Sequence, residues 1–292
     1  MKPLHSFALL LHYESLTLID AEHGVIVSEA PLAAPAGRPG KWLFGPDAEA
    51  AAGRMHLFAT PHFPLAEYFA WFLSRFYPLR RLKLLLLSAE PMPPLNVSLW
   101  EHLFAGLGLP APLQLRSPLA PLAAARQRGL LVYLADGVAQ LAVCRKGQID
   151  ELSQAGYGYF LTRAVRQHVL AQQGLQIDVP TAEQAWLRLG ACERQLTLEG
   201  SDAEGRPRRL LLIAEELRPA FAAAFEPLLR EIVYLAALHP NLPLQLYGSH
   251  ADWLLRVNAE AGTLALADPL VLTPDAERIL IHSIQHYLRG MA

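Results

Sequence analysis

The stretch Leu130–Gly158, LLVYLADGVAQLAVCRKGQIDELSQAGYG, decides the fold of this chain. Two apolar runs flank a tight turn at Asp136-Gly137, and a second turn at Arg145-Lys146-Gly147 leads into a third segment. Short apolar runs joined by Asp-Gly are typical of a β-hairpin, because that dipeptide suits a two-residue turn. The stretch therefore predicts three consecutive antiparallel strands, with a helix over residues 159–171 behind them.

The same order of strands and turns occurs at the start of the chain. Segments 6–11, 16–20 and 25–28 are largely apolar, and polar or glycine-containing turns separate them. A unit of this kind at the head of each half predicts two duplicated α/β domains that face each other across a cleft.

Hydrophobic spacing predicts the elements around these two units. A helix is expected over 63–77, and a strand covered on both faces over 82–87. The Pro-, Ala- and Gly-rich segment 30–40 predicts an irregular connection. Thr181, with Gln184 three residues later, predicts the N-cap of a helix. The remaining expected elements are helices at 47–53, 95–106, 180–189, 215–239, 251–259 and 274–289, and strands at 195–199, 208–213, 244–247 and 264–267.

Composition narrows the functional classes. The 292 residues suit about two domains of ordinary size. Hydrophobic residues make up 52% of the chain and the mean hydropathy is +0.21, which predicts large cores or a surface that meets a membrane or a partner. A net charge of -2 argues against general nucleic-acid binding. Cys144 and Cys192 lie far from each other and from any His pair, which predicts a reducing compartment and no metal site.

No run of about 18 apolar residues is present, so no membrane-spanning helix is expected. Residues 6–11 are interpreted as a first strand and not as part of a signal peptide.

A series of short motifs follows the chain in a fixed order. They are Gly24-Val25-Ile26-Val27 with Glu29 and Pro31, Phe44-Gly45-Pro46-Asp47-Ala48 with Gly53-Arg54, Pro118-Leu119-Ala120-Pro121-Leu122-Ala123-Ala124, Thr181-Ala182-Glu183, Glu199-Gly200-Ser201-Asp202 with Gly205-Arg206-Pro207-Arg208, Glu226-Pro227-Leu228, and Ala267-Asp268-Pro269-Leu270. In order and spacing they resemble the motifs of the bacterial actin MreB family, among them G-I-V-L-N-E-P, E-E-P-M-A-A-A, T-A-E and A-E-D-P-L. The resemblance runs along nearly the whole chain.

The resemblance implies an α/β, actin-like (ribonuclease H-like) fold with two duplicated α/β domains around a central cleft, each with a small or reduced subdomain. Domain I is expected to comprise 1–129 plus 274–292, with a reduced subdomain at about 32–54. Domain II is expected to comprise 130–273, with a small subdomain at about 173–218.

This chain departs from the family at the nucleotide-binding motifs. The family's D-L-G-T aligns with Leu11-His12-Tyr13-Glu14, and its D-I-G-G-G-T with residues 133–138, where one glycine remains. Ser117 replaces a glutamate that positions water, and the family's G-G-G becomes Gly248-Ser249-His250. A nucleotide-binding actin needs glycines near phosphate and carboxylates for Mg²⁺. We therefore expect no catalytic residue, no metal site and no ATP hydrolysis by the usual mechanism.

Remnants of a nucleotide-binding cleft are expected at Asp136, Gly137, Gly156, Gly158 and Gly248. Asp-Gly is also the commonest hairpin turn, and we favour that explanation for Asp136. A strand-to-helix turn explains Gly156 and Gly158 equally well.

Other polar residues have similar alternatives. His12 and Glu14 would line the cleft, but a polar turn is the simpler explanation. His250 would contact a base or cap the following helix, and we favour capping. No G-x-S-x-G motif is present from which a Ser/His/Asp hydrolase site would start.

One loop bears on partners. Its apolar residues Phe76, Tyr77 and Leu79 precede Arg80 and Arg81, a pattern that can dip into an anionic membrane surface. The resemblance agrees, because MreB-like proteins associate with membranes through a hydrophobic loop in this region. The alternative is a helix end that packs its aromatic residues under the domain and leaves the arginines in solvent.

These expectations describe a cytoskeletal or scaffolding pseudo-ATPase of the MreB/actin type, with a role in cell shape or envelope organisation. It would act by self-association or by binding a protein partner, without a cofactor. One alternative is an active ATPase that binds ATP and Mg²⁺ and forms nucleotide-dependent filaments; another is an adaptor that binds a membrane protein's tail. The expected location is the cytoplasm, at the inner face of the membrane, with peripheral membrane contact and no nucleic-acid partner.

Overall fold

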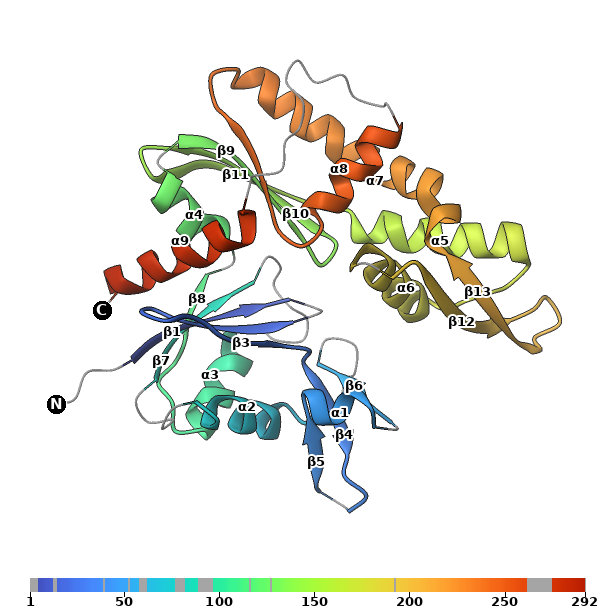
Figure 1. Cartoon of the computed structure of the whole chain (residues 1–292), viewed down its shortest axis with the longest axis horizontal. Helices are drawn as coiled ribbons and strands as arrows, with labels where there is room; N and C mark the ends of the chain where they lie inside the picture. Colours follow the sequence, from blue (N-terminus) through green and yellow to red (C-terminus); the bar gives the residue numbers. More distant parts are fainter. Residues whose placement is uncertain are drawn as a thin grey trace. The chain divides into compact units, whose positions relative to one another are not determined.

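The computed structural model describes residues 5–12, 15–38, 40–51, 53–57, 62–76, 82–88, 97–115, 117–126, 128–191, 193–261 and 275–291. The chain divides into two compact units (Figure 1). Unit 1 comprises Met1–Ala125 and Arg278–Ala292, and unit 2 comprises Arg126–Glu277.

A five-stranded sheet forms the centre of unit 1, in the order β3-β2-β1-β7-β8. The first three strands are an antiparallel meander, whereas β7 and β8 run parallel to β1 and to each other. Their bounds are β1 His5–Leu11, β2 Leu16–Asp20, β3 Gly24–Glu29, β7 Leu82–Leu87 and β8 Leu113–Leu115. The strands expected over 6–11, 16–20, 25–28 and 82–87 are confirmed.

Both faces of this sheet are covered. Phe7 and Leu9 of β1 share a hydrophobic core with helices α2 (Leu65–Ser74) and α3 (Val97–Gly106). Helix α9 (Ala276–Met291) is tied to the β2–β3 turn by hydrogen bonds from its Gln285 and Arg289 side chains to backbone carbonyls. The short helix α4 (Leu119–Arg126) follows β8.

A small second sheet of unit 1 corrects one prediction. The segment 30–40 was expected to be irregular, but it contains β4 (Leu32–Pro35). This strand pairs with β5 (Trp42–Phe44) and β6 (Met55–His56), and helix α1 (Pro46–Glu49) packs on it. The pairing places Ala33 and Ala34 in a fully buried position, which local Pro and Gly content did not indicate.

The sheet of unit 2 repeats the strand order of unit 1. Its order is β11-β10-β9-β14, again an antiparallel meander with a parallel strand beside the first. The bounds are β9 Arg128–Ala135, β10 Val138–Arg145, β11 Gln148–Gly156 and β14 Leu244–Tyr247. The hairpin and the third strand predicted within 130–158 are confirmed. Every residue of β9 after Arg128 is buried, which indicates that both faces of this strand are covered.

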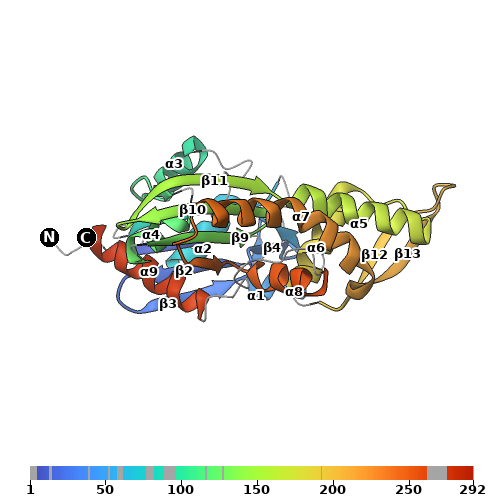
Figure 2. The same ribbon diagram turned by 90° about the horizontal axis from the view of Figure 1, so that it is seen from above.

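Four packed helices and a hairpin make up the rest of the described part of unit 2. Helix α5 (Gly158–Gln173) contacts both α6 (Val179–Ala191) and α7 (Ala214–Leu238), and α8 (Ala251–Ala261) packs on α7. The hairpin of β12 (Gln195–Ser201) and β13 (Pro207–Ile213) extends beyond the ends of α5 and α6 in both views (Figure 1, Figure 2).

The N-cap predicted for α6 is wrong. The helix begins at Val179, so Thr181 lies inside its first turn. Its cap is Asp178, whose Oδ1 accepts a hydrogen bond of 2.8 Å from the Thr181 backbone N–H. Asp178 and Thr181 lie three positions apart and both residue types favour N-caps, so the sequence alone does not decide which of them precedes the helix.

Two further findings concern membranes and undescribed segments. None of the helices in the described part of the chain has the length and apolar content to span a bilayer. The strand expected at 264–267, with the motif at 267–270, lies outside the described residues.

Candidate functional site

The turn between β9 and β10 has the geometry of a tight hairpin. Asp136 and Gly137 both have positive φ, 53° and 82°. A two-residue turn with positive φ at both positions matches the right-handed twist of the flanking strands. The explanation that we favoured for Asp136, turn chemistry, therefore agrees with its backbone.

This turn is in direct contact with the start of α5. A Cβ atom built on Gly137 would lie 2.9 Å from the Gly158 Cα, and one on Gly158 would lie 3.1 Å from the Gly137 Cα. The Gly137 carbonyl accepts hydrogen bonds of 2.8 Å from the backbone N–H groups of Tyr157 and Gly158. The glycines thus permit protein to approach protein, and these two N–H groups already have an acceptor.

The Trp186 indole of α6 covers the contact. Its Cη2 atom would lie 3.0 Å from a Cβ on Gly137, and its ring is 3% exposed. Trp186 Nε1 donates a hydrogen bond of 2.9 Å to Thr162 Oγ1, which in turn donates to the Gly158 carbonyl. The indole is therefore fixed in orientation as well as buried.

Further aromatic rings surround Trp186. Tyr157 and His250 are 1% and 2% exposed, and Tyr157 Oη lies 2.6 Å from His250 Nδ1. The rings of Phe225 and Trp253 pack against Tyr157 and His250 respectively. We call Tyr157, Trp186, Phe225, His250 and Trp253 the aromatic cluster; it fills the space beside the hairpin turn with side chains.

The sequence did not predict the position of the His250 ring. His250 immediately precedes α8, and its carbonyl accepts the Leu254 N–H, while its ring is buried in the core against Tyr157. For Trp186 the sequence does contain a pattern, since the apolar residues Ala182, Ala185 and Trp186 are spaced as on one face of a helix, and all three are buried in α6. That spacing predicts a buried face but not the neighbour it covers.

The two remaining glycines behave differently from each other. Gly248 has φ 96°, and a Cβ atom there would lie 2.1 Å from the Leu134 carbonyl oxygen. It allows the end of β14 to approach β9. Gly156 ends β11, and a Cβ there would meet nothing within 4 Å. Asp136, Gly137 and Gly158 are thus brought together, Gly248 lies at the neighbouring strand end, and nucleotide contact by any of the five stays a prediction.

A buried phenol stands where the resemblance expects an acid. Tyr133 is fully buried in β9, and burial raises the pKa of its hydroxyl well above the ordinary value, with a further increase from the Asp136 carboxylate. Burial, the Asp136 carboxylate and Tyr133 raise the pKa of the Tyr157 hydroxyl, although a hydrogen bond between this hydroxyl and the Gly137 backbone opposes them. Both groups are therefore neutral at pH 7 and cannot replace a carboxylate as a Mg²⁺ ligand.

Unit 1 contributes little to such a site in its described part. Ser117 Oγ accepts the Leu119 N–H at 3.1 Å and so begins α4. Of the other aligned positions, Tyr13 and Glu14 lie outside the described residues. Within the described ranges, no group of three or more His, Cys, Asp and Glu side chains gathers to hold a metal ion.

Only one residue of the predicted membrane loop can be placed. Phe76 is partly buried against the core of unit 1, and the Arg75 guanidinium lies 5.0 Å from its ring centroid. Arg75 also pairs with Glu29 at 2.8 Å. Tyr77, Leu79, Arg80 and Arg81 lie outside the described residues, so the membrane loop stays a prediction.

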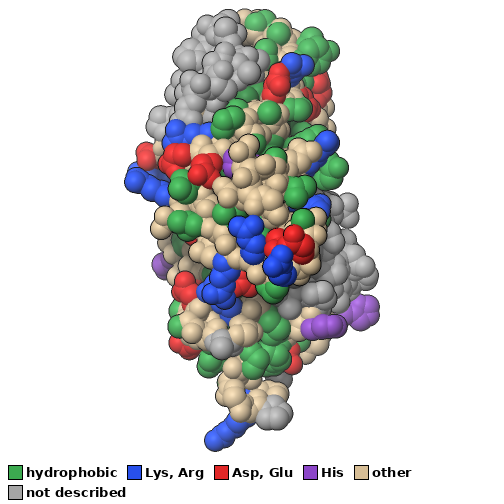
Figure 3. All heavy atoms as spheres, turned by 90° about the vertical axis from the view of Figure 1, so that its right-hand side faces the viewer, with side chains coloured by type: hydrophobic (Ala, Val, Ile, Leu, Met, Phe, Trp, Pro, Cys, Tyr) green, Lys and Arg blue, Asp and Glu red, His purple; other side chains and the backbone are tan. Residues whose placement is uncertain are grey.

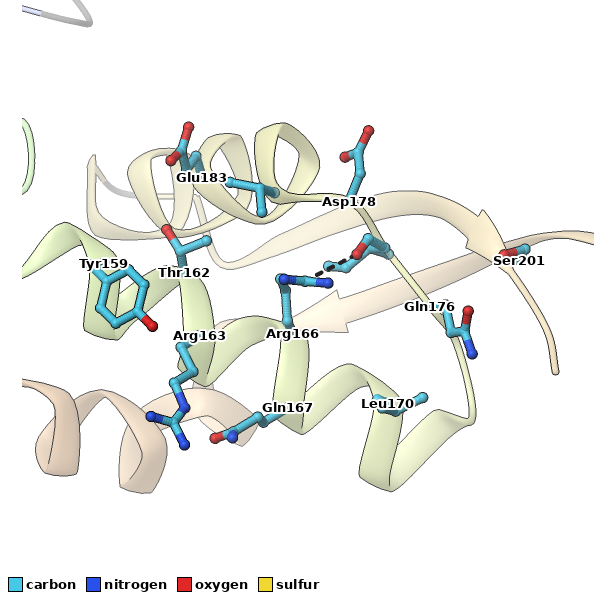
Figure 4. Close-up of a pocket in the computed structure, with 12 residues that line it drawn as sticks. Tyr159, Thr162, Arg163, Arg166, Gln167, Leu170, Gln176, Asp178, Glu183 and Ser201 are labelled. Atoms are coloured by element: carbon cyan, nitrogen blue, oxygen red, sulfur yellow. Dashed lines mark hydrogen bonds between the residues drawn. The ribbon is translucent and has the colours of Figure 1, made fainter. Parts of the chain in front are cut away.

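A groove of ≈ 830 Å³ runs along α5 (Figure 4). Tyr159, Arg163 and Arg166 line it from α5, and Asp178 and Glu183 line it from the start of α6. Arg166 Nε donates to the Ile177 carbonyl at 3.2 Å, the bond drawn in the figure. The lining thus contains two basic and two acidic side chains.

Many exposed charges elsewhere in unit 2 form ion pairs. On the face drawn in Figure 3, several Lys and Arg side chains lie next to Asp and Glu side chains. Exposed ion pairs of unit 2 include Arg188–Glu193 at 2.7 Å and Arg209–Glu199 at 2.8 Å.

Comparison with known proteins identifies the fold. No protein-family model matches the chain, and no curated protein matches its sequence. Solved structures do match. The crystal structure of MreB5 of Spiroplasma citri bound to AMPPNP superposes with a TM-score of 0.67 and 16% identity, over 100% of this chain and 98% of that chain.

The fold is actin-like. The ADP-bound form of the same MreB5 gives a TM-score of 0.67 and 16% identity over 99% of this chain and 97% of that one. The MamK double helical filament gives 0.61 and 11% over 98% of each chain. The fold class predicted from the sequence is thereby confirmed, and at these identities the likeness extends to the fold alone.

Proposed function

We propose that this protein is an actin-like cytoskeletal or scaffolding protein that does not hydrolyse ATP by the usual mechanism. It acts by associating with further copies of itself or with a protein partner, in cell shape or envelope organisation. The proposed location is the cytoplasm at the inner face of the membrane. The fold supports the scaffolding role, since the structural neighbours include a filament of MamK.

One observation carries the pseudo-ATPase part of the proposal. Gly137 and Gly158 contact each other under Trp186, and the Tyr157 and Gly158 N–H groups donate to the Gly137 carbonyl. A phosphate at this turn would need free backbone N–H groups and a concave space. To provide them, the Tyr157 and Gly158 N–H groups would have to break their two hydrogen bonds to the Gly137 carbonyl, and Trp186 would have to move away from the turn.

Calorimetric titration with Mg·ATP tests the proposal, together with sedimentation of the protein with and without nucleotide. We expect no ATP binding at the Gly137 turn, no phosphate release, and the same pelleted fraction in both sedimentation runs. Micromolar ATP binding with turnover would overturn the pseudo-ATPase assignment.

A working nucleotide-dependent filament is the second candidate, because the matched MreB5 structures are bound to AMPPNP and ADP. It requires that pelleting increases when Mg·ATP is added. The third candidate, an adaptor for a membrane protein's tail, requires a monomer under all conditions. Sedimentation therefore separates the three.

A further inference from the structure

A second groove in unit 2 lies at the end of the sheet opposite the Asp136-Gly137 turn. Its volume is ≈ 450 Å³, and its lining includes Arg128, Arg145, Lys146 and the segment 238–242 after α7. Because β9 begins at Arg128 and β10 ends at Arg145, a full strand length separates this groove from the aromatic cluster. The two sites are therefore distinct.

Two of the cations are cross-strand neighbours. Arg145 lies directly opposite Arg128 in the antiparallel pairing of β10 with β9. Residues that face each other in this way leave the sheet on the same side, and like charges there are destabilising. Local conflicts of this kind are expected at functional sites, where stability is not the only requirement.

Lys146 adds a third cation in an unfavourable backbone conformation. It occupies the first turn position between β10 and β11 with φ 52°. Gly, Asn and Asp are the usual residues in such turns, since a positive φ strains other side chains. Lysine offers no conformational advantage at this turn position, so its positive charge is the property that distinguishes it there from the usual turn residues.

Acidic neighbours neutralise only part of this charge. Arg145 Nη1 lies 2.9 Å from Asp150 Oδ2 and its Nη2 lies 3.2 Å from His239 Nδ1, so this guanidinium is partly engaged already. Arg128 Nη2 donates to the neutral Asn241 carbonyl at 2.6 Å. In the described part of the chain, no carboxylate pairs with Arg128 or Lys146, whereas Arg188 and Arg209 of the same unit each pair with a glutamate.

We propose that this groove binds a phosphate-type dianion, supplied by a soluble phosphate compound or by a phospholipid headgroup. A phosphate monoester carries a charge of about −1.5 to −2 at pH 7 and three strong acceptor oxygens. That charge matches the two cations without a carboxylate partner, Arg128 and Lys146. One guanidinium group can donate two parallel hydrogen bonds to two oxygens of a phosphate. The hydrogen bond to the Asn241 carbonyl orients Arg128 before the ligand binds.

Calorimetry with pyrophosphate on the whole protein tests the site, at an ionic strength held constant with sodium chloride. Wild type is expected to bind saturably. The variants Lys146→Asn and Arg128→Gln are each expected to bind about tenfold more weakly or worse, because each loses a charge-assisted hydrogen bond. Lys41→Asn, at an exposed lysine of unit 1, is the matched control and should bind as wild type does.

Thermal unfolding separates a binding role from a structural one. Asparagine suits the positive φ at position 146, so Lys146→Asn should unfold at the same temperature as wild type or a higher one. Loss of binding in a variant that folds this well supports the site. Equal pyrophosphate binding by wild type and both variants overturns it.

Vesicles distinguish the two sources of phosphate. Co-sedimentation with phosphatidic acid vesicles but not with phosphatidylcholine vesicles, lost in Lys146→Asn, assigns a lipid headgroup. Pyrophosphate binding without vesicle binding assigns a soluble ligand. No saturable binding to either probe refutes the proposal. An ATP signal that disappears in Lys146→Asn belongs to this groove and leaves the test of the Gly137 turn unaffected.

Discussion

Replacing Trp186 by alanine removes the side chain that covers the contact between Gly137 and Gly158. The indole is 3% exposed, and its Cη2 lies 3.0 Å from where a Gly137 Cβ would be. Truncation of a buried tryptophan costs about 3–5 kcal/mol in the free energy of unfolding. Thr162 Oγ1 keeps its bond to the Gly158 carbonyl, so the lost hydrogen bond adds little to this value.

Urea denaturation followed by circular dichroism measures the loss, and amide hydrogen exchange locates it. The Tyr157 and Gly158 amides should exchange faster in Trp186→Ala, because their acceptor, the Gly137 carbonyl, is no longer shielded. Trp186→Phe keeps one six-membered aromatic ring at this position, so its free energy of unfolding should fall by less than half as much as that of Trp186→Ala.

Trp42→Ala provides a matched control in unit 1. The Trp42 side chain is only partly buried, so its truncation should cost less than the loss at Trp186 and should leave the exchange of Tyr157 and Gly158 unchanged. A loss below about 1 kcal/mol for Trp186→Ala, without faster exchange, would refute the closed turn.

Three further predictions concern single residues. Gly248→Ala should prevent unit 2 from folding normally, because its φ is 96° and the new Cβ would lie 2.1 Å from the Leu134 carbonyl oxygen. Gly156→Ala should be tolerated, because a Cβ there meets no atom within 4 Å; the denaturation midpoints of the two variants test this difference. Burial raises the pKa of Asp20, but hydrogen bonds from the backbone and side chain of His23 and the backbone of Glu22 outweigh it and bring the pKa below 3.8. Asp20 therefore stabilises the fold above its unfolded pKa and loses this contribution as the pH falls through its folded pKa, so Asp20→Ala should destabilise the protein at pH 7 and much less in acid. Burial also raises the pKa of the Cys144 thiol, so a thiol reagent should leave Cys144 unmodified in the native protein, as mass spectrometry of its peptide can show.

Most of the regular elements could be predicted because their signals are local. Strand β14 was expected at 244–247 and found at Leu244–Tyr247, and helix α7 was expected at 215–239 and found at Ala214–Leu238. Alternating or helical spacing of apolar residues needs only neighbouring positions to be recognised. The strand β4 was not predicted, because its burial depends on pairing with β5 and β6, and the residues of β4 alone do not indicate that pairing.

The candidate site was predicted only in part. The departures at Tyr133 and Ser117 were visible in the sequence, and the structure places a buried phenol and a helix-starting hydroxyl there. The aromatic cluster was not anticipated. Tyr157 and His250 are 93 positions apart, and no local pattern connects their rings.

The sequence by itself determined the order of strands and helices, the Asp-Gly turn and the loss of the acidic and glycine positions, since each is a matter of residue type at a known spacing. Only the tertiary structure decided what occupies the space beside that turn. Helix α6 brings Trp186 over Gly137, and the strand end at Gly248 brings His250 against Tyr157. Close packing of distant segments, and not any local preference, therefore closes the turn.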